Sequence, residues 1–264
     1  MGTYLGQNFL IDAKVRTYIA DKISALYKNC GCEVLIEIGP GKGSITKLIH
    51  AISGNFFLID KDPTFFDSGE LKIEKGEFIL SDILELDVEQ MLEEKKLSPG
   101  KTLVVGNLPY YITSPILRKF FGSGKQEFVG GIFMVQDEVG QKIRSDAKKK
   151  SYLRWLLNYA CDVTYLKGVP AKCFKPIPKV KSCLIQFTIK NQATSVNRNK
   201  FIEFLELFAP FSRKTLGAIS KMIKKKSDKI SFEIPISLSS KRLEELTWAD
   251  LTLILSKNLQ SLAN

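Results

Sequence analysis

The tetrapeptide Asn107-Leu-Pro-Tyr110 offers the most specific chemistry in the sequence, and it follows a short apolar run that predicts a buried strand. The Asn107 side-chain carbonyl and the Leu108 backbone carbonyl could each accept one N–H of an exocyclic amine and so orient its lone pair. Pro109 stiffens the turn, and Tyr110 offers a ring face on which a base could stack. The turn indicates methyl transfer to an aromatic amine, although an ordinary Asn-capped strand exit would use the same residues.

A second candidate site is the glycine-rich stretch Gly39-Pro-Gly-Lys-Gly43. It follows the β-branched run Val34 to Ile38 and precedes an apolar-periodic segment from Ile45 to Ile52. Strand, turn and helix in this order place a nucleotide ligand beyond the carboxyl end of the strand. Asp60 ends the next apolar run, Asn55 to Ile59, where a carboxylate about 20 residues further on typically binds ribose hydroxyls.

The spacing of the glycines narrows the class of nucleotide. G-x-G-x-G differs from the dinucleotide pattern G-x-G-x-x-G, and Lys42 precedes Gly43 rather than the Ser or Thr that holds magnesium in a P-loop. Asp82 and Ile83 close a third strand candidate, where a carboxylate can bind an adenine amine and an aliphatic side chain can cover the ring. A merely tight turn at the glycines and a solvated helix cap at Asp82 are the alternatives.

Composition and charge limit the partners. The chain has 264 residues, a formal net charge of +11 and a pI near 9.3. This positive charge favours a polyanionic partner, and nucleic acid is the first candidate. Lysines that only maintain solubility would also give a positive net charge. Five scattered cysteines and one histidine, without a CxxC pair, indicate free thiols and no metal site. No apolar run approaches the roughly 20 residues of a membrane span, and no signal peptide is evident, so we expect a cytoplasmic protein.

The basic residues gather in clusters rather than spreading evenly. Clustered cations beside a base pocket are what phosphate contacts require, although those at 224–226 would also complement a helix dipole. The predicted RNA contacts are Lys148, Lys149, Lys150, Lys175, Lys179, Arg213, Lys214 and Lys221.

The elements that must position these groups alternate between strands and helices. Further strand candidates are Phe78 to Leu80, Thr102 to Val105 and Gly131 to Val135, so the pattern predicts an α/β fold with a mostly parallel sheet and helices on both faces. The segment from Lys190 to Lys200 is polar and is predicted to be a linker.

Helical patterns dominate after this linker. They cover 201–208, 214–223 and two stretches within 241–262. We therefore predict a catalytic domain over residues 1–192 and a small all-helical domain, for the RNA substrate, over residues 193–264.

Six ordered segments resemble the ribosomal RNA adenine N6-dimethyltransferases of KsgA type. The segments are Leu5-Gly-Gln-Asn-Phe-Leu10, Glu37-Ile-Gly-Pro-Gly41, Asp60-Lys-Asp-Pro63, Asn107-Leu-Pro-Tyr-Tyr-Ile-Thr-Ser-Pro115, Phe174-Lys-Pro-Ile-Pro-Lys-Val-Lys-Ser182 and Arg213-Lys-Thr-Leu216. The resemblance implies a Rossmann-like methyltransferase core with a seven-stranded sheet, dependent on S-adenosylmethionine. It also implies that the protein dimethylates two adjacent adenines near the 3′ end of small-subunit ribosomal RNA, in ribosome biogenesis. The substrate would be the RNA itself or the pre-ribosomal small subunit, and the protein would act as a monomer.

The same resemblance assigns roles to residues. The cofactor contacts that it implies are Gln7, Asn8, Leu10, Glu37, Gly39, Gly41, Asp60, Lys61, Asp82, Ile83 and Asn107. Among these, Gln7, Asn8 and Leu10 would line the methionine end. Phe174 would stack on the target base opposite Tyr110. The sequence departs from the family at Asp60, where Glu is usual, and at Tyr152-Leu-Arg-Trp155, where Tyr-Gly-Arg-Leu is usual.

Three other functions share parts of this pattern. A single-site methyltransferase of antibiotic-resistance type acts on large-subunit ribosomal RNA with the same Asn-x-Pro-Tyr chemistry. A non-enzymatic RNA-binding or transcription-factor relative would keep the fold and lose the motif residues, which are intact here. A DNA adenine methyltransferase is the third alternative.

Overall fold

The computed structural model describes residues 8–64, 76–122, 128–147, 151–190, 197–226 and 232–258. Its main sheet has seven strands in the order β4-β3-β2-β5-β6-β9-β7. In that order their bounds are Glu77–Leu80, Asn55–Asp60, Val34–Ile38, Thr102–Asn107, Gly130–Gln136, Ser182–Ile189 and Cys161–Val169. The pairings are parallel except those of β9, which is antiparallel to both neighbours. The predicted Rossmann-like, mostly parallel sheet of seven strands is therefore confirmed.

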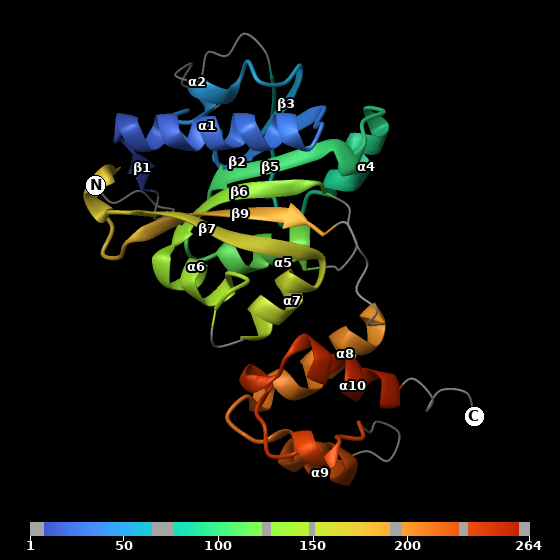
Figure 1. Cartoon of the computed structure of the whole chain (residues 1–264). Helices are drawn as coiled ribbons and strands as arrows, with labels where there is room; N and C mark the ends of the chain where they lie inside the picture. Colours follow the sequence, from blue (N-terminus) through green and yellow to red (C-terminus); the bar gives the residue numbers. More distant parts are fainter. Residues whose placement is uncertain are drawn as a thin grey trace.

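Helices cover both faces of this sheet (Figure 1). Helices α1 (Ala13–Asn29) and α2 (Thr46–Ile49) pack on one face, and α4 (Val88–Glu94), α5 (Thr113–Phe121), α6 (Asp137–Ile143) and α7 (Tyr152–Ala160) on the other. Every residue of β2 is buried, as expected for a central parallel strand between two helical layers. The sequence predicted a longer helix, from Ile45 to Ile52, than the single turn that α2 forms.

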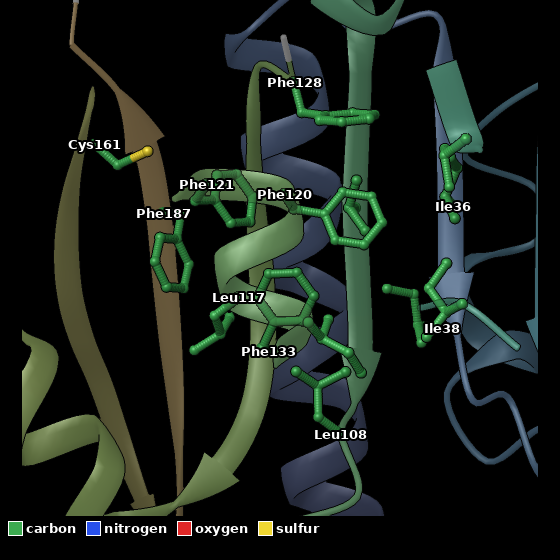
Figure 2. Close-up of a cluster of buried hydrophobic side chains, with 14 of the residues drawn as sticks. Ile36, Ile38, Leu108, Leu117, Phe120, Phe121, Phe128, Phe133, Cys161 and Phe187 are labelled. Carbon is green, nitrogen blue, oxygen red and sulfur yellow. The ribbon is translucent and has the colours of Figure 1, made fainter. Parts of the chain in front are cut away.

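Aromatic side chains fill the space between α5 and the strands. The Phe121 ring stacks on Phe187 of β9, with centroids 4.6 Å apart and planes at 10°, and meets the edge of Phe133 of β6 at 5.9 Å. Figure 2 shows these rings with Phe120 and with Leu108, which lies at the end of β5. This cluster fixes β9 against α5, so the turn that leads from β5 into α5 rests on a packed core.

A short second sheet ties the N-terminal segment to the body of the protein. Strand β1 (Phe9–Leu10) pairs antiparallel with β8 (Phe174–Lys175), which follows the 3₁₀ turn η2 (Ala171–Cys173). Asp12 then caps α1 by accepting a hydrogen bond from Val15 N at 2.9 Å. The pairing holds the residues just before α1 over the carboxyl end of the main sheet.

The C-terminal helices surround a separate apolar cluster. They are α8 (Arg198–Phe208), α9 (Leu216–Lys226) and α10 (Trp248–Lys257), with 3₁₀ turns η3 (Ala209–Phe211), η4 (Ile236–Leu238) and η5 (Leu243–Glu245) between them. Trp155 of α7 joins this cluster, because its Nε1 donates to Leu243 O at 3.2 Å. The boundary predicted at 192/193 falls outside the described residues and stays a prediction.

Candidate active site

A cavity of about 970 Å³, including its open mouth, lies beyond the carboxyl ends of β2, β3, β4 and β5. Each of these strands contributes the residues that follow it, and the N-terminal segment closes one side. The lining includes Asn8, Phe9, Glu37, Gly39, Gly41, Asp60, Lys61, Ser81, Ile83 and the run from Asn107 to Ile112. The structure thus brings together the two motifs that the sequence singled out.

The glycine-rich turn has a backbone that side chains would strain. Gly39 and Gly41 have φ of 66° and 51°, in the left-handed region that glycine adopts without steric cost. A Cβ on Gly41 would lie 3.2 Å from a ring carbon of Phe9. The absence of side chains lets the Phe9 ring close on the turn, so Phe9 belongs to the site although the sequence analysis did not select it.

Asp60 lies at the junction of this turn and β3. Its Oδ1 accepts from Asp62 N at 3.0 Å. Burial raises the pKa of Asp60, whereas backbone hydrogen bonds from Asp62 and Gly41 lower it. The carboxylate is thereby oriented beside the glycine turn, in the position that suits ribose hydroxyls.

Glu37 is the most deeply buried acidic group of the cavity, at 3% exposure. Its Oε2 has no hydrogen-bond partner among the residues that the structure describes. Burial raises the pKa of Glu37 to about 7, the Thr46 hydroxyl lowers it and the charge of Asp60 raises it. A buried acceptor without a partner suits an ammonium ligand. S-adenosylmethionine carries such a group, so Glu37, the open glycine turn and Asp60 fit this cofactor.

The Asn107 side chain is anchored from the far end of the chain. Its Nδ2 donates to Asn8 O at 3.1 Å, and this network assigns Oδ1 as the remaining acceptor of the amide. Within the turn, Pro109 O accepts from Ile112 N at 3.2 Å and from Thr113 Oγ1 at 3.1 Å. These bonds hold Asn107 and the backbone of the turn in place before any substrate binds.

Gly106 allows β5 to reach this turn. A Cβ at this position would lie 2.5 Å from Ile38 O on the neighbouring strand, closer than side chains approach a backbone oxygen. A glycine within an apolar strand marks a close approach of two backbones, so the sequence contains a signal for the role of Gly106. Gly106 was not among the predicted site residues.

Tyr110 lines the cavity with its ring half-buried, and its hydroxyl is bonded to Ser182 Oγ at 2.7 Å. Burial raises the pKa of Tyr110, and the hydrogen bond with Ser182 lowers it. Ser182 is completely buried at the start of β9. It ends the Phe174-to-Ser182 segment of the resemblance, yet its role in holding Tyr110 was not predicted.

Two predicted site residues belong to the core instead. Leu10 and Phe174 are each 1% exposed and pack in the cluster under α1. Adjacent strand residues point to opposite faces, so Phe9 takes the cavity side of β1 and Leu10 the core side. Phe174 is paired with Leu10 across β8 and β1, which places it on the same side. In this structure the Phe174 ring is packed in the core, and its stacking on a base opposite Tyr110 stays a prediction.

Asp82 stabilises the turn that follows β4 and does not cap a helix, which was its alternative role; the cap of α4 is Asp87. Its Oδ1 accepts from Leu84 N at 2.9 Å, and its Oδ2 lies 3.5 Å from Lys61 Nζ. Ser81 and Ile83, on either side, line the cavity, whereas Asp82 is absent from the described lining. An adenine amine would have to share Oδ2 with Lys61.

The predicted RNA contacts lie in two described regions. Lys175 and Lys179 are exposed on the loop that leads to Ser182, and Arg213, Lys214 and Lys221 are exposed in and before α9. Gln7, Lys148, Lys149 and Lys150 lie outside the described residues. The described ranges hold no helix long and apolar enough to cross a membrane, and no cluster of three or more potential metal ligands.

Comparisons with known proteins agree on one family. The profile of the family described as "Ribosomal RNA adenine dimethylase" matches residues 2–257. Ribosomal RNA small subunit methyltransferase A of Mesoplasma florum is 33% identical over 220 residues, with 80% of each chain covered. The protein of the same name from Mycoplasma mycoides is 32% identical over 246 residues, covering 90% of this chain and 89% of its own.

Two solved structures share the fold. A dimethyladenosine transferase from Plasmodium falciparum superposes with a TM-score of 0.69 at 21% identity, covering 95% of this chain and 97% of its own. The 23S rRNA methyltransferase ErmE superposes with a TM-score of 0.60 at 20% identity, covering 94% of this chain and 100% of its own. With the family profile spanning nearly the whole sequence, the chain belongs to the ribosomal RNA adenine dimethylase family.

Proposed function

We propose that this protein transfers methyl groups from S-adenosylmethionine to the N6 amine of two adjacent adenines near the 3′ end of small-subunit ribosomal RNA, during ribosome biogenesis. The observation that carries the proposal is the Asn107 amide, fixed by Asn8 at a cavity whose other walls are the glycine turn and Asp60. The names of the relatives from Mesoplasma and Mycoplasma support the small subunit as the substrate.

Some residues of the cavity are proposed to bind the methyl donor, and others to bind the adenine amine that accepts the methyl group. Glu37 would hold the ammonium group at the methionine end, and Asp60 would hold the ribose. The cofactor, when bound, supplies an electrophilic methyl group. Asn107 Oδ1 and Leu108 O each accept one N–H of the adenine amine, which aims its lone pair at that methyl. Transfer would form an N–C bond in place of the S–C bond, and the amine would then release one proton to solvent.

Tyr110 supplies the binding face for the target base. An extruded base loses its stacking in the RNA, and stacking on an aromatic side chain restores roughly 1–3 kcal/mol. Because the Ser182 hydroxyl holds the Tyr110 hydroxyl at 2.7 Å, the ring is oriented before the base arrives. Lys175 and Lys179, on the loop before Ser182, are proposed to bind phosphates of the same RNA.

The large-subunit alternative keeps a specific point in its favour, since ErmE shares the fold over 94% of this chain.

Our main proposal, methylation of the small-subunit RNA, includes a monomer that acts in the cytoplasm, on RNA or on a pre-ribosomal particle. Sedimentation velocity of the purified protein alone would test the monomer.

The decisive test is transfer of radiolabelled methyl from S-adenosylmethionine to purified small subunits that lack adenine dimethylation. Large subunits, naked RNA and duplex DNA serve as parallel substrates. Label recovered as N6,N6-dimethyladenosine from small subunits is the expected result. Label confined to large subunits would indicate the resistance-type activity, and cofactor binding without any transfer would indicate a non-enzymatic role.

A further inference from the structure

A second tyrosine stands at the mouth of the cavity and takes no part in the mechanism above. Tyr111 is 58% exposed, although it lines the same cavity as Tyr110. The ring of its neighbour is half-buried and bonded to Ser182, whereas Tyr111 projects toward solvent. A large exposed aromatic side chain beside a site for an extruded base is suited to stacking a further base.

Lys61 lies next to this tyrosine at the mouth of the cavity. Its Nζ is 6.0 Å from the Tyr111 ring centroid and 3.5 Å from Asp82 Oδ2, and its side chain is 38% exposed. Both contacts are long, and an exposed ion pair contributes little to stability. The amine is therefore held at the mouth while remaining open to a stronger anionic partner.

The charge of Lys61 argues against the cofactor as that partner. S-adenosylmethionine has a sulfonium, an ammonium and a carboxylate group and no phosphate, so its net charge is positive and a lysine amine at the cavity mouth repels it overall. A phosphodiester, in contrast, suits an exposed lysine. The cofactor contact that the resemblance implies for Lys61 is thus the less favourable use of this side chain.

We propose that Tyr111 and Lys61 form a subsite for the nucleotide next to the adenosine being methylated, with its base stacked on Tyr111 and its phosphate on Lys61. The subsite rests on the proposed function, since it deepens how that site holds single-stranded RNA. Two consecutive tyrosines then serve two consecutive bases: Tyr110 the base at Asn107, and Tyr111 the base beside it. An RNA with two adjacent adenines occupies both faces at once.

The subsite can be tested with a single-stranded RNA of about ten nucleotides that contains two adjacent adenines. Fluorescence anisotropy measures its binding to the full-length protein. The matched RNA carries an abasic residue in place of one of the two adenines. Tyr111→Ala should weaken binding of the paired RNA about tenfold, in the range for one stacked base, and leave the abasic RNA little changed. Tyr111→Phe should bind like the wild type.

Lys61→Ala tests the phosphate contact in the same assay. The slope of the logarithm of the binding constant against that of salt concentration should become shallower by about 0.7, the value for one phosphate of a single strand. Lys14→Ala, which removes an exposed lysine of α1, is the matched control and should leave the slope unchanged.

Calorimetry with S-adenosylhomocysteine separates this subsite from the cofactor site. Unchanged affinity in Tyr111→Ala and Lys61→Ala supports the proposal. A comparable loss of cofactor affinity, or equal losses for paired and abasic RNA, would overturn it. If Tyr111 controls RNA binding as described but small subunits receive no methyl groups, the proposed function fails, and Tyr111 and Lys61 remain an RNA-binding site without the assigned methylation.

Discussion

At the scale of single residues, the site depends on side chains that are oriented by groups far away in the sequence. Asn107 is held by the backbone of Asn8, and Tyr110 by the hydroxyl of Ser182. Neither partner takes part in the proposed methyl transfer. Preorganisation of this kind removes the entropy of orienting the reacting groups from the barrier.

Asn107→Ala should lower the single-turnover rate of methyl transfer by about 100-fold or more, the range for loss of one positioned polar group at a reacting centre. The affinity for S-adenosylhomocysteine should change little, because Glu37 and Asp60 remain. Rapid-quench kinetics on small subunits and calorimetry measure the two quantities. Transfer at the wild-type rate would remove Asn107 from the mechanism.

Ser182→Ala and Tyr110→Phe should slow transfer by similar factors, because each removes one end of the same 2.7 Å hydrogen bond. A net hydrogen bond contributes about 1 kcal/mol, so a roughly fivefold effect is expected. The double variant should be no slower than either single variant. Additive losses in this cycle would mean that Ser182 acts through something other than the tyrosine.

Glu37 makes cofactor binding depend on pH. Its pKa is raised to about 7, and its ionised form binds the ammonium group. Affinity should therefore rise as the pH increases through 7, whereas Glu37→Gln should show weak binding with a much flatter profile across the same pH values. Calorimetry between pH 5.5 and 8.5 covers this range; the same pH dependence in Glu37→Gln would contradict the assignment.

The stability of the protein without cofactor should have the opposite dependence on pH. A carboxyl group whose pKa is higher in the folded than in the unfolded state stabilises the fold at low pH, and this stability is lost as the pH rises through the folded value. For Glu37 the loss occurs between about 4.5 and 7. Thermal melts of wild type and Glu37→Gln should converge at acidic pH.

At the scale of elements, strand β9 links the core to the site. Phe187, near its end, stacks on Phe121 of α5, and Ser182, at its start, holds Tyr110. A loss of packing at one end is expected to loosen the hydrogen bond at the other.

Phe187→Ala should lower the free energy of unfolding by about 3–5 kcal/mol, the cost of removing a buried phenylalanine ring. Leu253→Ala, at an α10 position that is 44% exposed, is the control and should stay within about 0.5 kcal/mol of wild type. Urea denaturation measures both. A small effect at Phe187 would show that the aromatic cluster repacks.

The sequence predicted the elements whose pattern is unambiguous. The central strands β2, β3 and β5 are short and mainly apolar, and the glycines and carboxylates at their carboxyl ends fall where parallel strands place them. Strands β7 and β9 were missed, because their antiparallel pairing depends on partners distant in the sequence. The burial of Phe174 could not be read from its motif, since it follows from the β1–β8 pairing that also buries Leu10.

At the scale of the whole molecule, the net charge of +11 should dominate encounter with RNA. The logarithm of the binding constant should fall linearly with the logarithm of salt concentration. The double variant Arg213→Ala/Lys214→Ala should make this slope shallower by about one to two units and leave cofactor affinity unchanged. Filter binding of small-subunit RNA across salt concentrations tests this, and an unchanged slope would exclude the segment before α9 from the interface.

The contact between the catalytic unit and the C-terminal helices also determines what spectroscopy can detect. The sequence contains two tryptophans, Trp155 of α7 and Trp248 of α10, whose rings meet edge to face with centroids 4.9 Å apart. All indole emission therefore originates at this junction, and none originates in the cavity. Quenching or a red shift on adding RNA would report rearrangement of the helices, while a ligand confined to the cavity would leave the emission spectrum unaltered.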